Sequence, residues 1–179
     1  SEGDIFEFGV YKGNGVIAMA LLLKSLGVKK KIYAFDSFTG FPGYHPNDDL
    51  NQFKLRNDLF SPDHVDEAER AMAIAEFRTG MQVTPSNIST SGDFSDASRQ
   101  YLETRLKKFG LDNVEIIEGS FAETVPNFLR NYKGTVFSAN IDCDLYVGYK
   151  DTLQPMYDLL VKDGFINLDE YYSLKFPGA

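Results

Sequence analysis

The chain has 179 residues with a formal net charge of −8, and 43% of its residues are apolar. This length suits one domain with a sizeable core. An acidic surface repels phosphate groups, which argues against nucleic acid or an anionic membrane as a partner. The single cysteine excludes an internal disulfide and favours a reducing compartment, so we expect a cytoplasmic protein.

The first forty residues predict a strand, a helix and a second strand. Residues 5–8 are a short apolar run, and residues 14–26 repeat apolar side chains at helical spacing before Gly27, a typical helix terminator. A second apolar run over 31–35 ends at Asp36. Such a unit is typical of a parallel sheet.

Residues 42–96 interrupt this regularity. They are rich in turn residues, and they contain one predicted helix over 61–78, with Ser61 as its N-cap and Pro62 in its first turn. A long segment with little apolar periodicity is typical of a lid or a binding loop. We therefore interpret residues 1–179 as a single domain that carries a lid or acceptor-binding segment at about 42–96.

The alternation of helix and strand returns after residue 96. The predicted elements are a helix over 97–109, a strand over 114–119, a helix over 121–132, a strand over 135–142, a helix over 150–161 and a strand over 164–170. The strands are continuous apolar runs, which indicates burial on both faces. The sequence therefore predicts an α/β protein: a Rossmann-like, doubly wound, mostly parallel sheet with helices on both faces.

Each predicted strand ends in a carboxylate. Ligands of such sheets bind beyond the carboxyl ends of the strands. The acids expected there, in chain order, are Glu7, Asp36, Glu118, Asp142 with Asp144, and Asp169 with Glu170.

A glycine loop follows the first strand. Gly9, Gly13 and Gly15 are spaced G-x-x-x-G-x-G, which matches neither the dinucleotide fingerprint nor the P-loop. This spacing favours a nucleotide-like ligand without a pyrophosphate, although a tight strand-to-helix turn would also use glycine. Asp36 lies where such folds place an acid that accepts hydrogen bonds from ribose hydroxyls. A solvated loop acid is the alternative.

The acids after the last two strands suggest a metal site. Asp142 and Asp144 face the same side of an extended segment, and Asp169 and Glu170 end the next strand. Converging carboxylates raise one another's pKa unless a cation joins them, and Mg²⁺ prefers such oxygen ligands. The alternative is a set of separate helix caps and surface acids.

The remaining reactive side chains have simpler interpretations. We interpret His45 and His64 as lid or surface residues, and Cys143 as a small buried residue rather than a nucleophile. Four tyrosines near the acids line an acceptor pocket or form its rim: Tyr146, Tyr149, Tyr171 and Tyr172.

Four blocks of the sequence resemble a known family. These blocks are GDIFEFGVYKGNG, YAFDSFTGFP, LKKFGLDNVEIIEGSFAETVP and IDCDLYVGYKDTLQPMYDLLVKDGFINLDEYY. In order and spacing they resemble the macrocin O-methyltransferase (TylF-type) family, over most of the chain except about 44–90. The resemblance implies a class I S-adenosylmethionine-dependent methyltransferase that uses Mg²⁺ to methylate hydroxyls on sugars of small natural products.

The resemblance also implies a role for each matching residue. Asp142 and Asp144 would be catalytic, with Asp144 as general base, and Asp142, Asp169 and Glu170 would bind the metal. The implied cofactor-binding residues are Glu7, Phe8, Gly9, Val10, Tyr11, Gly13, Gly15, Asp36, Ser37, Phe38, Gly119, Ser120, Phe121 and Asp142.

The chain departs from the family pattern at three places. It has Asp169-Glu170 where the family usually has two aspartates, its segment over 44–90 is longer than usual, and it ends at Ala179, where the fold normally adds two edge strands. Three alternatives therefore stay open: a metal-independent methyltransferase, a non-catalytic cofactor-binding domain, and an NAD-linked oxidoreductase, which the loop spacing disfavours. We expect a hydroxylated small-molecule partner, and a homo-oligomer stays open.

Overall fold

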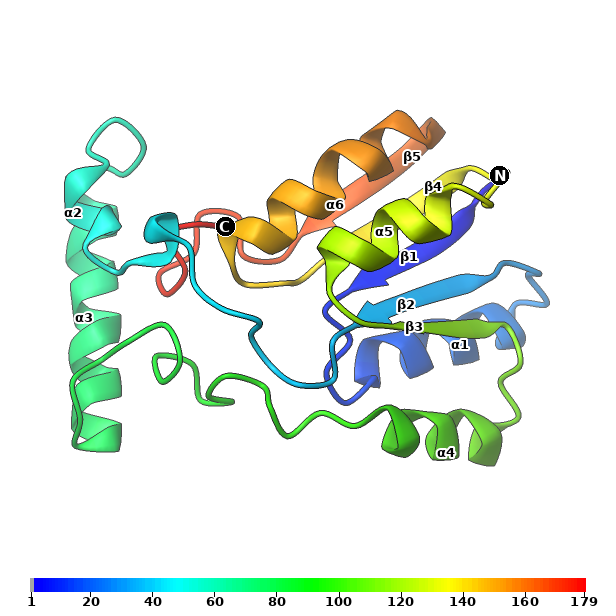
Figure 1. The fold of residues 1–179 in the computed structure, drawn as a ribbon, viewed down its shortest axis with the longest axis horizontal. Helices are drawn as coiled ribbons and strands as arrows, with labels where there is room; N and C mark the ends of the chain where they lie inside the picture. The colour runs from blue at the N-terminus through cyan, green and yellow to red at the C-terminus, as the bar shows by residue number, and fades with distance from the viewer. Residues whose placement is uncertain (1) are drawn as a thin grey trace.

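The computed structural model describes residues 2–179 and contains one five-stranded sheet (Figure 1). Its strands lie in the order β3-β2-β1-β4-β5, and every pairing is parallel. Their bounds are Asp4–Phe8 (β1), Ile32–Asp36 (β2), Val114–Glu118 (β3), Val136–Ile141 (β4) and Leu160–Leu168 (β5). The predicted α/β class and parallel sheet are confirmed.

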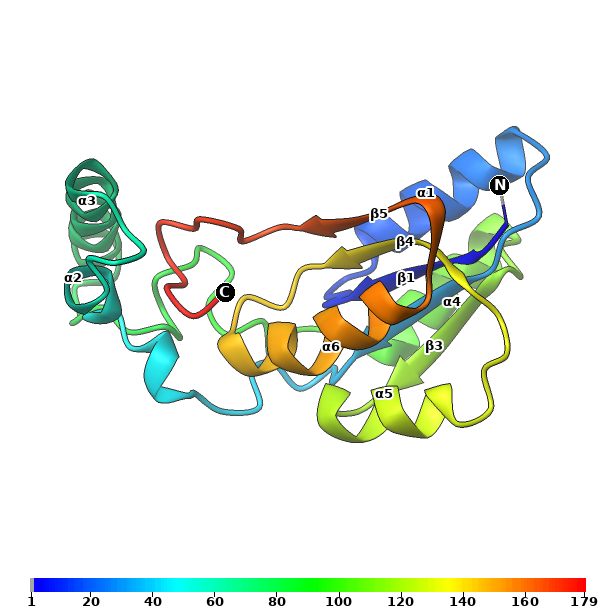
Figure 2. The ribbon, with the colours of Figure 1, turned by 90° about the horizontal axis from the view of Figure 1, so that it is seen from above.

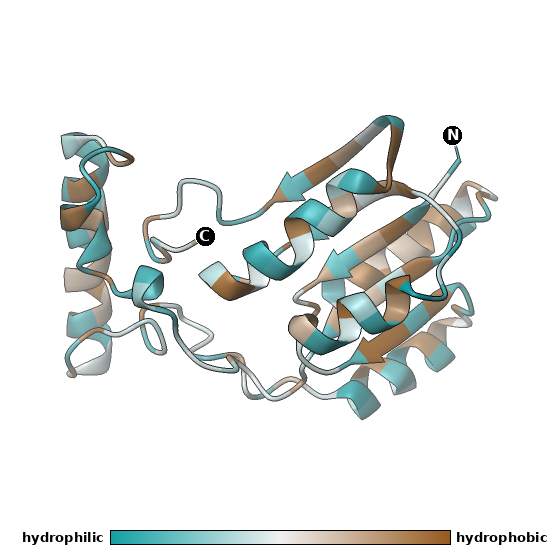
Figure 3. Ribbon diagram, turned by 45° about the horizontal axis from the view of Figure 1, so that its top comes forward, coloured by the Kyte–Doolittle hydropathy of each residue, from teal (hydrophilic) through white to brown (hydrophobic). Residues whose placement is uncertain are grey.

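Helices cover both faces of the sheet (Figure 2). Helices α1 (Asn14–Ser25) and α4 (Arg99–Phe109) bury apolar side chains on one face, against Ile5 of β1. Helices α5 (Phe121–Leu129) and α6 (Tyr146–Asp158) pack on the other face, against the neighbouring residue Phe6. Successive strand residues point to opposite faces, so both need an apolar side chain. This is the predicted doubly wound arrangement, and the strands are brown over much of their length in Figure 3.

Several helix ends lie where the sequence predicts them. Helix α3 (Pro62–Thr79) begins after Ser61, whose hydroxyl accepts a hydrogen bond from the His64 N–H, and ends at the left-handed Gly80. Helix α4 likewise ends at the left-handed Gly110. These caps are local, so the sequence alone is enough to predict them.

Helix α6 begins earlier than predicted. It runs over Tyr146–Asp158 rather than 150–161, and β5 starts at Leu160 rather than 164. The N-cap residue, Leu145, has no side-chain oxygen that could accept a hydrogen bond from the first turn. The Asp48 carboxylate takes this part and accepts a hydrogen bond from the Tyr146 N–H at 2.8 Å. Because this cap is 98 residues away in the sequence, no local pattern indicates it.

The segment over 42–96 lies beyond the carboxyl ends of the strands, apart from the sheet (Figure 1). It contains the 3₁₀ turn η1 (Pro46–Asp48), the short helix α2 (Gln52–Leu55) and α3. Its own apolar cluster consists of Leu50, Phe53, Phe60, Ala68, Ala75 and Ile88, joined by Leu145 and Phe176. Among the described residues, no helix is long and apolar enough to cross a membrane.

Candidate active site

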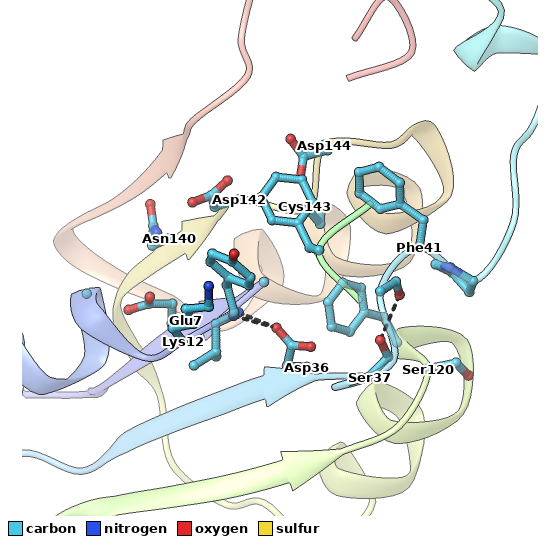
Figure 4. Close-up of a pocket in the computed structure, with 18 of the residues that line it drawn as sticks. Glu7, Lys12, Asp36, Ser37, Phe41, Ser120, Asn140, Asp142, Cys143 and Asp144 are labelled. Atoms are coloured by element: carbon cyan, nitrogen blue, oxygen red, sulfur yellow. Dashed lines mark hydrogen bonds between the residues drawn. The ribbon is translucent and has the colours of Figure 1, made fainter. Parts of the chain in front are cut away.

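A cavity of about 320 Å³ lies at the carboxyl ends of the strands (Figure 4). The glycine loop after β1, the turn after β2, the start of α5 and the end of β4 line it, together with Phe94 from the segment over 42–96. This size and position are typical of a small-molecule site in a parallel α/β sheet.

Most of the residues implied for the cofactor line this cavity. They are Glu7, Gly9, Val10, Tyr11, Gly15, Asp36, Ser37, Gly119, Ser120, Phe121 and Asp142. Three others do not: Phe8 and Phe38 are buried in the two core clusters, and Gly13 packs against Leu102. Asp144 also lines the cavity.

The loop needs its glycines mainly because of protein neighbours. An added Cβ on Gly9 would overlap the Asp142 carbonyl oxygen, so glycine lets the ends of β1 and β4 approach closely. A Cβ on Gly15 would lie 2.6 Å from the Glu7 Oε1 atom. The missing side chain therefore makes room for the Glu7 carboxylate beside the start of α1.

Asp36 shapes the glycine loop from the end of β2. Its Oδ2 atom accepts hydrogen bonds from the Val10 and Tyr11 N–H groups at 2.7 Å each, and its Oδ1 atom accepts one from the Phe38 N–H at 2.7 Å. A carboxylate can accept about four hydrogen bonds, so one position remains for a ligand hydroxyl.

Three acids in the cavity have pKa values raised to near neutral pH. Burial raises the pKa of Glu7 to about 7, with the Asp142 charge adding to the effect. Burial and the nearby Asp169 raise the pKa of Asp142 to about 7. Burial and the nearby Glu170 raise the pKa of Asp144 to about 8. Such groups readily exchange a proton near neutral pH, or attract a cation.

The implied metal ligands do not form a metal site in this structure. Within residues 2–179, no three histidine, cysteine, aspartate or glutamate side chains are gathered so that they could hold a metal ion. The Asp142 and Asp169 carboxyl groups are close enough to share a hydrogen bond. Glu170 accepts a hydrogen bond from the Ser173 hydroxyl, which orients its carboxylate and leaves its other oxygen open. These oxygen donors are of the kind that Mg²⁺ prefers.

Aromatic side chains from the segment over 42–96 and its borders close one wall of the cavity. The Phe94 ring lies 5.2 Å from the Tyr11 ring and 5.4 Å from the Phe41 ring, measured between centroids. Sequence reasoning missed Phe94 and Phe41 as lining residues, together with Lys12, Asn14, Gly40, Pro42, Asn140 and Cys143. Lys12 and Asn14 lie inside the glycine loop, which is the one signal that could have found them.

Most of the remaining cysteine, tyrosine and histidine residues discussed in the sequence analysis have structural roles. Cys143 is buried, as expected, and burial raises the pKa of its thiol. The Tyr149 hydroxyl is buried between the Ile141 carbonyl and the Glu170 N–H, whereas Tyr171 is exposed. The interpretation of His64 as a lid or surface residue is wrong in one respect, because its ring is only 6% exposed and its Nε2 atom lies 3.0 Å from the Ser173 carbonyl oxygen.

Comparisons with known proteins point to one family. The family model described as "Macrocin-O-methyltransferase (TylF)" matches residues 1–79 and 84–176. The chain is 26% identical over 172 residues to mycinamicin III 3''-O-methyltransferase from Micromonospora griseorubida, covering 94% of this chain and 55% of that protein. It is 24% identical over 172 residues, or 94% of this chain and 53% of the relative, to 8-demethyl-8-(2,3-dimethoxy-alpha-L-rhamnosyl)-tetracenomycin-C 4'-O-methyltransferase from Streptomyces olivaceus.

The fold also matches a solved structure. CalS11, described as a calicheamicin methyltransferase, superposes with a TM-score of 0.68 at 25% identity over 98% of this chain and 60% of that one. The chain thus spans about half the length of the two curated relatives.

Proposed function

The chain belongs to the macrocin O-methyltransferase family, and from that premise we propose that it transfers a methyl group from S-adenosylmethionine to a hydroxyl of a small-molecule acceptor. The acid-lined cavity beside the glycine loop is the observation that carries this proposal. Glu7, Asp36 and Asp142 all line that cavity.

The cavity suits S-adenosylmethionine chemically. The sulfonium and ammonium groups of this cofactor are cations, which buried carboxylates such as Glu7 and Asp142 attract. The acceptor position left on Asp36 suits a ribose hydroxyl. Phe121, beside Gly119 and Ser120, offers an apolar surface for adenine.

Asp144 is the general base in this proposal. When bound, S-adenosylmethionine supplies a methyl group on a positively charged sulfur, and the C–S bonding electrons stay on that sulfur when the methyl leaves. Asp144 takes the proton that the attacking hydroxyl loses, and a pKa near 8 suits this task around neutral pH. The glycine loop and the aromatic wall hold the two reactants in line, which supplies much of the rate.

The need for Mg²⁺ is tested separately. Asp142, Asp169 and Glu170 offer the oxygen donors that Mg²⁺ prefers, but no three such side chains gather within residues 2–179, so no step of this mechanism is routed through a metal. An EDTA titration decides between two alternatives: turnover that survives EDTA would favour a metal-independent methyltransferase, and complete loss that added Mg²⁺ restores would favour a metal site built from these acids.

The acceptor class follows from the relatives. One protein similar to this chain is named as the 4'-O-methyltransferase of a rhamnosyl-tetracenomycin, and another as the mycinamicin III 3''-O-methyltransferase. We therefore propose a sugar hydroxyl on a small natural product as the methyl acceptor. The segment over 42–96, which brings Phe94 to the cavity, is the part of the chain expected to contact it.

Calorimetry with S-adenosylhomocysteine, the demethylated product, and with NAD as control tests the cofactor. Micromolar binding of S-adenosylhomocysteine without NAD binding is the expected result, and the reverse would overturn the proposal. Transfer of labelled methyl from S-adenosylmethionine to a panel of glycosides tests the reaction. Cofactor binding without transfer to any glycoside would favour a non-catalytic cofactor-binding domain.

A further inference from the structure

The cavity has an uneven charge distribution. Four of its lining residues are acids: Glu7, Asp36, Asp142 and Asp144. Lys12 is the one basic residue among the side chains that line it. A ligand carboxylate would be repelled by these acids when they are ionised, and Lys12 is the charged lining residue that would attract it.

Lys12 is held by an acid from a distant part of the chain. Its Nζ atom lies 2.5 Å from the Asp96 Oδ2 atom and 4.7 Å from the centre of the Tyr11 ring. The two charged side chains are 40% and 60% exposed, and such exposed ion pairs contribute little to stability. A competing carboxylate could therefore replace Asp96 at low cost.

The backbone of the loop is fixed independently of this ion pair. The Arg105 guanidinium donates hydrogen bonds to the Lys12 carbonyl oxygen at 2.7 Å and to the Asn14 Oδ1 atom at 2.9 Å. The segment that carries Asp96 has its own anchor, a hydrogen bond from the Phe41 N–H to the Asp93 carbonyl oxygen at 3.1 Å. The Lys12 side chain can therefore change partner while both backbones stay in place.

We propose, on the premise of the proposed function, that Lys12 binds the α-carboxylate of S-adenosylmethionine and that Asp96 occupies Lys12 until the cofactor arrives. The Asp96 carboxylate is then an internal stand-in for the ligand carboxylate. Lys12 would then recognise the amino-acid end of the cofactor, and its charge is opposite to that of the acids that line the rest of the cavity.

Two ligands separate this role from a general effect on the cavity. S-Adenosylhomocysteine carries the α-carboxylate, whereas 5'-methylthioadenosine lacks the whole amino-acid end. Calorimetry on Lys12→Met should show S-adenosylhomocysteine affinity falling by about 10- to 100-fold, the range for losing a charged hydrogen bond. The affinity for 5'-methylthioadenosine should change by less than about twofold, and Lys12→Arg should restore most of the loss.

Asp96 gives a test in the opposite direction. Asp96→Asn removes the competitor, so the affinity for S-adenosylhomocysteine should rise by a few-fold while that for 5'-methylthioadenosine stays unchanged. In a chain that already carries Lys12→Met, Asp96→Asn should not increase the affinity for S-adenosylhomocysteine any further. Equal losses for both ligands, or no loss, in Lys12→Met would overturn this inference alone. Failure of the unsubstituted chain to bind S-adenosylhomocysteine would overturn the proposed function, and this inference with it.

Discussion

Asp144 combines burial, position and an unusual backbone. It is 7% exposed, lines the cavity and adopts a left-handed conformation with φ of 58°, which aspartate tolerates better than most residues. Asp144→Asn keeps the shape of the side chain but removes the carboxylate that we propose as the general base. We expect turnover to fall by about 10²- to 10⁴-fold, the usual contribution of a general base. Steady-state methyl transfer measures this loss.

Asp163 supplies the matched control for that substitution. It is exposed and also left-handed, with φ of 66°, at the far end of β5. Asp163→Asn makes the same chemical change and should leave turnover within about twofold of normal, because Asp163 is exposed and is not among the residues that line the cavity. Full turnover in Asp144→Asn would rule out its role as base.

The sequence predicts the cavity residues that lie in a local pattern. The glycine loop and the acids at the strand ends follow from strand–turn–helix spacing, since parallel strands end at one edge. The partner of Lys12 does not, because Asp96 is 84 residues away in a segment without periodicity. Phe94 is missed for the same reason. The engagement of Glu170 by Ser173 depends on how the chain folds back after β5, and no spacing rule gives that.

At the scale of elements, Gly9 allows the ends of β1 and β4 to lie close together. An alanine there would combine a φ of 86° with overlap of its Cβ and the Asp142 carbonyl oxygen. We expect Gly9→Ala to lower the free energy of unfolding by more than about 3 kcal/mol. Gly27→Ala is the control: its φ is 65°, but nothing lies within 4 Å, so only the backbone penalty of about 1–2 kcal/mol applies. Urea denaturation of both variants makes the comparison, and equal losses would contradict it.

Asp48 connects the segment over 42–96 to α6. It is 1% exposed and accepts hydrogen bonds from the Tyr146 N–H and the His45 N–H, both at 2.8 Å. Asp48→Ala leaves two backbone donors without a partner, so we expect a loss of about 2–4 kcal/mol in the free energy of unfolding. The neighbouring Asp49 is exposed, and its side chain accepts hydrogen bonds from Asn51, so Asp49→Ala should cost below about 1 kcal/mol. A small effect of Asp48→Ala in thermal denaturation would contradict this account.

The hydrogen bond between Asp48 and the Tyr146 N–H explains why the sequence predicts some helix bounds correctly and misses the start of α6. Helices α3 and α4 start at local serine caps and end at glycines, so their bounds follow from pattern. Helix α6 takes its cap from Asp48, which is 98 residues away in the sequence. Its start was therefore predicted four residues late. Tertiary contacts override local sequence signals where a helix is capped by a side chain that is distant in the sequence.

At the scale of the whole molecule, the segment over 42–96 and the acids after β5 form one unit. His64 on α3 hydrogen-bonds the Ser173 carbonyl oxygen, and the Ser173 hydroxyl bonds Glu170. Phe176 is buried in the apolar cluster of that segment, and its ring contacts Phe41. Ser173 therefore links α3 to Glu170 through two hydrogen bonds.

The buried acids also set how the stability of the whole chain depends on pH. The pKa of Glu7 rises from 4.5 to about 7, that of Asp142 from 3.8 to about 7, and that of Asp144 from 3.8 to about 8. Between these unfolded and folded values, the folded chain binds more protons than the unfolded chain. The free energy of unfolding must then decrease as pH rises through this range and level off above the highest folded pKa.

We therefore expect these three acids to lower the stability of the ligand-free chain progressively between about pH 4 and pH 8, with the loss complete above about pH 8. Urea denaturation at several pH values measures this slope. Glu7→Gln and Asp144→Asn each remove one of the acids, so each should flatten the slope. S-Adenosylmethionine, with its two cationic groups, should stabilise the chain most where the acids are ionised, so its effect on the melting temperature should grow as pH rises. Stability that increases from about pH 6 to pH 8 in the free chain would mean that the acids are solvated rather than buried.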